Sequence, residues 1–146
     1  MEIKKLPKVQ VIMSTYNGEK YVQEQIESIF AQKECDISLL IRDDGSTDNT
    51  IDIVNELSKK YNIKLIKGNN LKPAKSFLEA LRYSGEEMDY YAFSDQDDIW
   101  NEKKIISAIN FIKKYTEPSL YIGNLCAVNE CKEILKDKIL PQIFLV

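Results

Sequence analysis

Three aspartates lie within four residues of the segment YAFSDQDDIW, directly after an apolar run. Carboxylates this close repel one another unless a cation lies between them. Asp95 and Asp97 alternate along the chain and can present oxygen atoms to one hard divalent cation, with Asp98 beside them. Mg²⁺ and Mn²⁺ prefer oxygen ligands and keep coordination sites for substrate phosphates and water. The spacing therefore favours a metal-assisted site at the end of this run.

The acidic segment has three other interpretations. A solvated turn in which one aspartate caps the next helix explains one carboxylate and leaves the other two without a role. An EF-hand calcium loop that starts at Asp95 would need glycine and glutamate at the positions where this chain has Trp100 and Ile106. The D-x-D order also resembles the nucleophile strand of haloacid-dehalogenase-type phosphatases, but that strand usually opens its fold, whereas strand-like runs precede Asp95 here. The cation site is the interpretation that we favour.

Two further polar segments follow strand-like runs. STYNG, Ser14 to Gly18, comes after KVQVIM, and DDGSTD, Asp43 to Asp48, comes after ISLLIR. Each segment alone is an acceptable strand-to-helix turn, because glycine, asparagine and aspartate favour turns without any ligand. Taken singly, neither segment indicates a function.

Strand-like and helix-like patterns alternate along the chain. The predicted strands are Lys8–Met13, Ile37–Arg42, Ile63–Lys67, Met88–Ser94 and Ser119–Val128. Helical spacing predicts four helices, with apolar faces that contain Val22 and Ile26, Ile51 and Val54, Phe77 and Leu81, and Ile105 and Ile109. Repeated strand–helix units predict an α/β fold with a mostly parallel sheet, right-handed crossovers and helices on both faces. In such folds ligands bind beyond the carboxyl ends of the strands, where the three polar segments would meet.

The composition is that of one globular domain spanning residues 1–146, with 44% apolar and 29% charged residues. A net charge of −3 argues against a nucleic-acid partner, and the lack of histidine excludes histidine-based catalysis and imidazole zinc sites. Cys35, Cys126 and Cys131 form no C-x-x-C pair, which indicates a reducing compartment. Since we find neither an apolar leader nor a run that approaches a membrane span, we expect a cytoplasmic protein.

In this order and spacing, the three polar segments resemble those of the family 2 glycosyltransferases. The matching stretches are VQVIMSTYNGEKYVQEQIESIFAQ, LLIRDDGSTDNT and YYAFSDQDDIWNEKKI, and the similarity extends from about Lys8 to about Ile112. SDQDDIW is most similar to the branch of rhamnosyltransferase-like and related surface-polysaccharide enzymes. The resemblance implies a GT-A, Rossmann-like nucleotide-binding fold. It also implies a nucleotide-diphosphate sugar as donor, and we expect a UDP- or dTDP-linked one.

The resemblance assigns the nucleotide to the first two segments. Ser14 and Tyr16 would line the base pocket, where an aromatic face suits a pyrimidine. Asp44 would accept a hydrogen bond from N3–H of the base, which uracil and thymine share, and Asp43 would support the turn or the ribose. Lys75 falls where many relatives have a basic residue, and it would either contact the diphosphate or be solvated.

The resemblance assigns the cation, Mn²⁺ or Mg²⁺, to the third segment. Asp97 would be its direct ligand, Asp95 would approach the ribose, the metal or a metal-bound water, and Asp98 would support the metal site or contact the acceptor. The expected reaction is inverting transfer of the sugar to a hydroxyl of a glycan or lipid-linked acceptor, while the cation offsets charge on the leaving diphosphate. A lipid-linked acceptor would bring the protein to the inner face of the membrane.

The sequence departs from the family in two respects. Lys72 stands near a position where relatives usually have glycine, which leaves the local loop and the role of Lys75 open. The acidic motif of relatives that carries the catalytic base has no match after Asp98, so we assign no base and expect the acceptor-binding half to be missing. The alternative function is a donor-binding module without turnover. The apolar tail ILPQIFLV would be either a strand separated from its partner sheet or a dimer contact.

Overall fold

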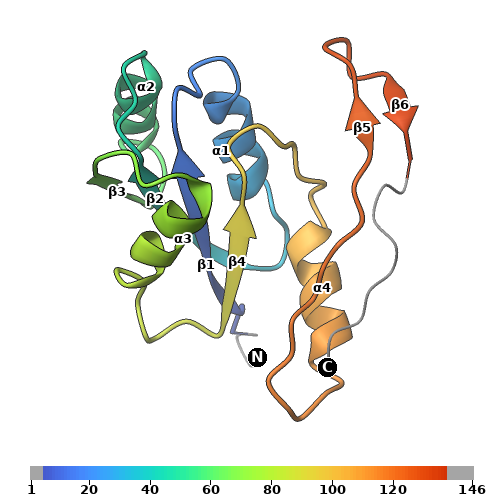
Figure 1. Cartoon of the computed structure of the whole chain (residues 1–146). Coiled ribbons are helices and arrows are strands. Elements are labelled where there is room, and N and C mark those ends of the chain that lie inside the picture. The colour runs from blue at the N-terminus through green and yellow to red at the C-terminus, as the bar shows by residue number, and fades with distance from the viewer. Residues whose placement is uncertain (1–4, 138–146) are drawn as a thin grey trace. The chain divides into compact units, whose positions relative to one another are not determined.

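The structure is a computed structural model, and it describes residues 5–137 of the chain. The chain divides after Lys103 into two compact units. The first unit contains a sheet with its helices, and Figure 1 shows its elements in chain order: β1 (Lys8–Thr15), α1 (Val22–Phe30), β2 (Asp36–Asp43), α2 (Thr50–Leu57), β3 (Ile63–Lys67), α3 (Pro73–Leu81) and β4 (Tyr90–Ser94).

The sheet of the first unit is parallel throughout, with the strand order β3-β2-β1-β4. β1 is central, and its Val11 lies opposite Leu39 of β2 and Ala92 of β4. β1 and β2 are buried along most of their length, as expected for parallel strands that are covered on both faces. β4 forms one edge of this sheet and alternates between exposed and less exposed residues, with Phe93 53% exposed. The sheet therefore has its core at β1 and β2.

Helices cover both faces of this sheet. α1 packs against α2, whereas α3 packs on β1 and β2. The connection from β3 to β4 passes back across the sheet, so a right-handed crossover places α3 on the face opposite α1 and α2 (Figure 1). The predicted α/β fold with a parallel sheet and helices on both faces is thus confirmed. The first four predicted strands are also confirmed, with Ile63–Lys67 matching at both ends.

The second unit contains α4 (Lys104–Ile112) and a short antiparallel hairpin of β5 (Ala127–Val128) and β6 (Ile134–Lys136). The predicted fifth strand, Ser119–Val128, is wrong over most of its length, because strand structure within it is confined to the last two residues. Gly123 and Asn124 interrupt its apolar run, and the Asn124 side chain accepts a hydrogen bond from the backbone N–H of Leu125 at 2.9 Å. Such local bonds compete with the bonds of a strand ladder.

Two expectations concern the ends of the chain and its apolar runs. The apolar tail ILPQIFLV, residues 139–146, lies outside the described residues. Across residues 5–137, none of the helices combines the length and the hydropathy that crossing a membrane requires.

Candidate functional site

A cavity of about 550 Å³ lies where the strands of the first unit end. Its lining includes five residues that the sequence singles out: Ser14, Tyr16, Asp44, Asp95 and Asp97. They come from the end of β1, the residue after β2 and the loop after β4, so the topology of the sheet brings all three polar segments to one place. This is the switch point of the sheet, where β1 is flanked by β2 on one side and by β4 on the other, and where open α/β sheets bind ligands.

Three other candidates do not line this cavity. Asp43 is buried and accepts hydrogen bonds from the Thr15 hydroxyl (2.9 Å) and from the backbone N–H of Ser46 (2.8 Å), so it holds the turn after β2. Lys75 lies in the first turn of α3 with an exposed side chain. Asp98 is exposed and follows Asp97 in the loop after β4.

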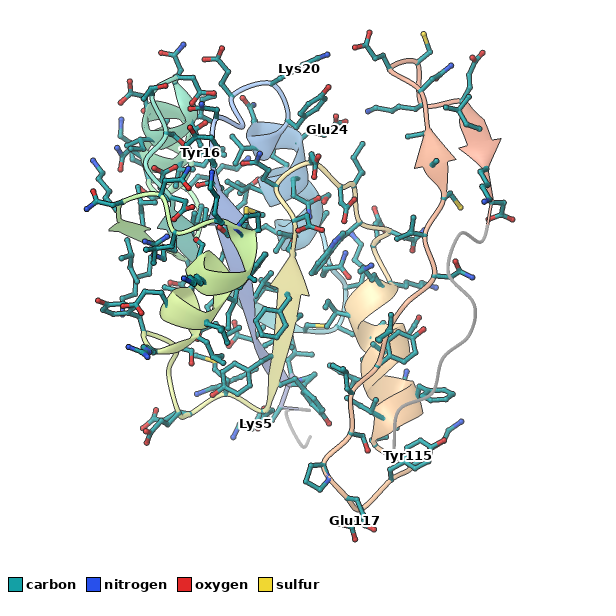
Figure 2. All side chains as sticks on the ribbon, in the orientation of Figure 1. Lys5, Tyr16, Lys20, Glu24, Tyr115 and Glu117 are labelled. Carbon is teal, nitrogen blue, oxygen red and sulfur yellow. The ribbon has the colours of Figure 1, made fainter. Side chains whose placement is uncertain are left out.

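Tyr16 follows the tip of β1 (Figure 2), and 47% of its surface is exposed. Its backbone N–H donates to Gln96 Oε1 at 2.9 Å, and Gln96 Nε2 donates back to the Tyr16 carbonyl at 3.1 Å. Gly18 makes room for this amide, since a Cβ there would collide with the Gln96 side chain. Gln96 therefore joins the loop after β1 to the loop that carries Asp95 and Asp97. No motif in the sequence indicates this role.

A buried ion pair lies beneath the cavity. The Arg42 guanidinium donates to the Asp44 carboxylate, to Ser76 Oγ at 2.8 Å and to the Asn69 carbonyl at 3.0 Å. Both charged side chains are 4% exposed. The Ser14 hydroxyl joins this network by donating to Ser76 Oγ at 2.6 Å. Arg42 thus holds together the ends of β1 and β2 and the start of α3, and no motif had indicated it.

The Asp44 carboxylate also shapes the loop before α3. It accepts hydrogen bonds from the backbone N–H groups of Leu71 (2.8 Å) and Lys72 (3.0 Å). Burial by itself raises the pKa of Asp44, but the hydrogen bond from Leu71 and the hydrogen bond and charge of Arg42 outweigh it and hold the pKa below its ordinary value. Asp44 is consequently ionised near neutral pH, with most of its acceptor capacity engaged by the protein.

The depressed pKa of Asp44 predicts a pH dependence of stability. Because this pKa is lower in the folded chain than in the unfolded one, the stabilisation is complete above the unfolded pKa, about 4, and is lost as the pH falls through the folded pKa. In urea unfolding, the difference in free energy of unfolding between the wild-type chain and Asp44→Asn should shrink from about pH 5 to about pH 2. A difference that stays constant over this range would contradict the assignment.

The acidic loop after β4 is anchored to α1 by a buried amide. The side chain of Gln25 is fully buried, 2.5 Å from Ser94 Oγ and 3.1 Å from Ser28 Oγ. Ser28 Oγ in turn accepts from the backbone N–H of Trp100 at 3.0 Å, and the Trp100 side chain is buried. Both ends of segment 95–99 are therefore tied to one helix, while Asp95 and Asp97 remain exposed.

The side chains at the cavity fit an oxygen-ligated cation that is shared with a substrate. Within residues 5–137, no group of three or more histidine, cysteine, aspartate or glutamate side chains is arranged to hold a metal. Asp95 and Asp97 nevertheless line the same cavity, and Mg²⁺ is typically held by one or two carboxylates together with substrate phosphates and water. The donor set suits Mg²⁺ or Mn²⁺ and lacks the sulfur and nitrogen ligands of a structural zinc site.

Comparison with known sequences identifies relatives of the first unit and of part of the second. The model of the family "Glycosyl transferase family 2" matches residues 10–134. The chain is 40% identical over 124 residues to the dTDP-rhamnosyl transferase RfbG of Shigella flexneri, covering 79% of this chain and 41% of that protein. It is 33% identical over 119 residues to the poly(ribitol-phosphate) β-N-acetylglucosaminyltransferase TarS of Staphylococcus aureus, covering 79% of this chain and 20% of that protein.

Solved structures agree with these matches. The S. aureus TarS 1–349 structure in complex with UDP-GlcNAc is similar with a TM-score of 0.66 and 33% identity, over 73% of this chain and 31% of that one. A Pyrobaculum calidifontis mannosyltransferase, solved with GDP-Man and Mn²⁺, has a TM-score of 0.68 at 21% identity, over 86% of this chain and 37% of that one, and shares the fold. The chain spans less than half the length of each of these relatives.

Proposed function

This chain belongs to glycosyl transferase family 2, and we propose that its cavity binds a UDP- or dTDP-linked sugar together with Mn²⁺ or Mg²⁺. The reaction proposed is transfer of the sugar, with inversion, to a hydroxyl of a glycan or lipid-linked acceptor in the synthesis of a cell-surface polysaccharide. The observation that carries this proposal is the convergence of Ser14, Tyr16 and Asp44 with Asp95 and Asp97 on one cavity. The relatives named for dTDP-rhamnose transfer or solved with UDP-GlcNAc support the choice of nucleotide.

The nucleotide would occupy the side of the cavity nearest β1 and β2. The half-exposed ring of Tyr16 offers an aromatic face to a pyrimidine, and stacking of this kind contributes about 1–3 kcal/mol per base elsewhere. Asp44, ionised and held by Arg42, offers an acceptor for N3–H of uracil or thymine. The hydroxyl of Ser14 is oriented by its bond to Ser76 and lies beside the same space. These groups bind and orient the base.

The diphosphate would lie toward the loop after β4. Asp97 and Asp95 would hold the divalent cation there, and when bound it supplies Lewis-acid stabilisation of charge on the departing nucleotide diphosphate. Gln96 fixes this loop against Tyr16, and Gln25 and Ser28 fix its ends, so the two carboxylates are presented by a well-anchored segment. Such anchoring matters because the acceleration depends on holding the reacting groups in place.

The proposal is tested by a thermal-shift panel of UDP, dTDP, GDP and ADP, each measured with Mn²⁺ and with a chelator. We expect UDP or dTDP to raise the Tm only when Mn²⁺ is present. A ligand at about 100 times its Kd stabilises by about 2.7 kcal/mol, which corresponds to a shift on the order of 5–10 °C. Equal shifts with Mn²⁺ and with chelator would contradict the role of the cation, and no shift with any of the four nucleotides would contradict donor binding.

The alternative, a donor-binding module without turnover, predicts the same thermal shifts. A binding module has no catalytic base, that is, no group that takes the proton of the acceptor hydroxyl. We assign no such base among the described residues. The nucleotide that raises the Tm identifies the sugar nucleotide to use in a transfer assay. This assay distinguishes the two functions, because only the enzyme releases free UDP or dTDP in an acceptor-dependent way.

A further inference from the structure

Lys72 adopts a backbone conformation that normally belongs to glycine. It immediately precedes α3 with φ 71° and ψ 158°. This combination lies in a region that is essentially restricted to glycine, because a Cβ there crowds the backbone. Pro73 does not explain this conformation, because a proline favours an extended ψ in the residue before it but does not favour a positive φ there. A side chain at this position is therefore a source of strain.

The surrounding structure holds Lys72 in this conformation through bonds to its own backbone N–H and carbonyl. Its N–H donates to Asp44 Oδ2 at 3.0 Å, and its carbonyl accepts from the backbone N–H of Ser76 at 2.9 Å, one of the first bonds of α3. Glycine would make both bonds equally well. The two bonds that fix the shape of this turn therefore do not require a lysine side chain.

The lysine side chain does, however, line the cavity. Of the described residues that line it, Lys72 is the one with a positive charge, and it faces the same space as Asp44, Asp95 and Asp97. The charge of Arg42, which lies beneath, is already paired with Asp44. No ion pair involves Lys72 within residues 5–137, and its side chain is exposed to solvent. Lys75, three residues further on, does not line the cavity.

We propose that Lys72 binds the diphosphate of the nucleotide donor and is retained in a strained backbone position for that purpose. This inference rests on the proposed function and adds to it a specific phosphate contact. Lysine suits the role because its ammonium is a compact charge on a flexible stem that reaches phosphate oxygens from several directions. It would act beside the cation held by Asp95 and Asp97, from a different loop, the one between β3 and α3.

The test compares Lys72→Gly with Lys72→Met by calorimetric titration and thermal unfolding. Lys72→Gly should raise the Tm of the ligand-free chain by a few degrees because it relieves the strain, whereas Lys72→Met should leave the Tm nearly unchanged. Both variants should raise the Kd of UDP or dTDP in the presence of Mn²⁺ by about tenfold or more, as expected for loss of one charged hydrogen bond. The Kd of uridine or thymidine, which lack phosphates, should not change. Lys59→Met serves as the matched control, because Lys59 is exposed after α2 and does not line the cavity, and it should bind all these ligands as the wild-type chain does.

The outcomes separate this inference from the function on which it rests. If the wild-type chain binds UDP or dTDP and both Lys72 variants bind it equally well, the contact with the diphosphate is refuted while donor binding stands. If the variants lose affinity for the nucleosides to the same extent, Lys72 acts on the base side and the proposal is wrong. A wild-type chain that binds no nucleotide overturns the proposed function first. A Tm for Lys72→Gly below that of Lys72→Met would overturn the premise of strain.

Discussion

Replacing Arg42 with methionine is expected to lower the free energy of unfolding by about 3–5 kcal/mol, with a fall in Tm on the order of 10 °C. The guanidinium and the Asp44 carboxylate are both 4% exposed, so the substitution leaves a buried carboxylate without its counter-ion. It also removes the donors to Ser76 Oγ and to the Asn69 carbonyl. Urea unfolding followed by circular dichroism measures the loss directly.

Two further variants sharpen this prediction. Arg82→Met removes a surface arginine whose ion pair with Glu79 is exposed, and it should change the free energy of unfolding by no more than about 0.5 kcal/mol. Adding Asp44→Asn to Arg42→Met should recover part of the lost stability, because the amide oxygen can still accept from Leu71 and Lys72 while the buried charge is gone. If the double variant is as unstable as Arg42→Met alone, the uncompensated charge is not the cause of the loss.

Replacing Asp97 with asparagine is expected to abolish most of the effect of Mn²⁺ on the affinity for UDP or dTDP. An amide oxygen carries no charge, and since altering even the groups that support metal ligands costs about 10–100-fold, loss of a direct ligand should cost at least as much. Fold stability should hardly change, because the Asp97 side chain is exposed. Titration of the nucleotide with Mn²⁺ and with chelator, for both proteins, isolates the part of the affinity that depends on the cation.

The matched control for this substitution is Asp36→Asn. Asp36 is also exposed, but it is the first residue of β2. It therefore lies at the amino-terminal ends of the strands, and it does not line the cavity. It should retain the full response to Mn²⁺. A wild-type response in Asp97→Asn, or an equal loss in Asp36→Asn, would show that Asp97 is not a ligand of the cation.

Much of the fold could be predicted because its signals are local. Continuous apolar runs of strand length gave β1 to β4, and the alternation with helical spacing implied a parallel sheet. Once the strands are parallel, the segments after them must meet at one edge, so the closeness of Tyr16, Asp44 and Asp97 follows from topology alone. Ser119–Val128 was mispredicted since an apolar run shows that residues can be buried, but not that a neighbouring strand is available to pair with them.

The support of the site could not be predicted, because it depends on pairs of residues distant in sequence. Arg42 ends a strand-like run, which gives no sign that it will bond Ser76, 34 residues away. Gln25 lies on the apolar face of a helix, and its partner Ser94 is 69 residues away. The glycine-like conformation of Lys72 arises from Asp44 on one side and α3 on the other. Each of these features becomes visible only when both partners are placed.

The position of β4 has a consequence for the order in which the molecule is made. β1 needs β4 to complete its pairing, and the contact between Tyr16 and Gln96 joins residues 80 positions apart, so it cannot form before the loop after β4 is in place. A nascent chain that has not yet delivered β4 has β1 as an open edge, ready to pair with another chain. The cavity does not exist at that stage, since Asp95 and Asp97 follow β4. Nucleotide binding during refolding would therefore report that β4 and the loop after it have joined the sheet.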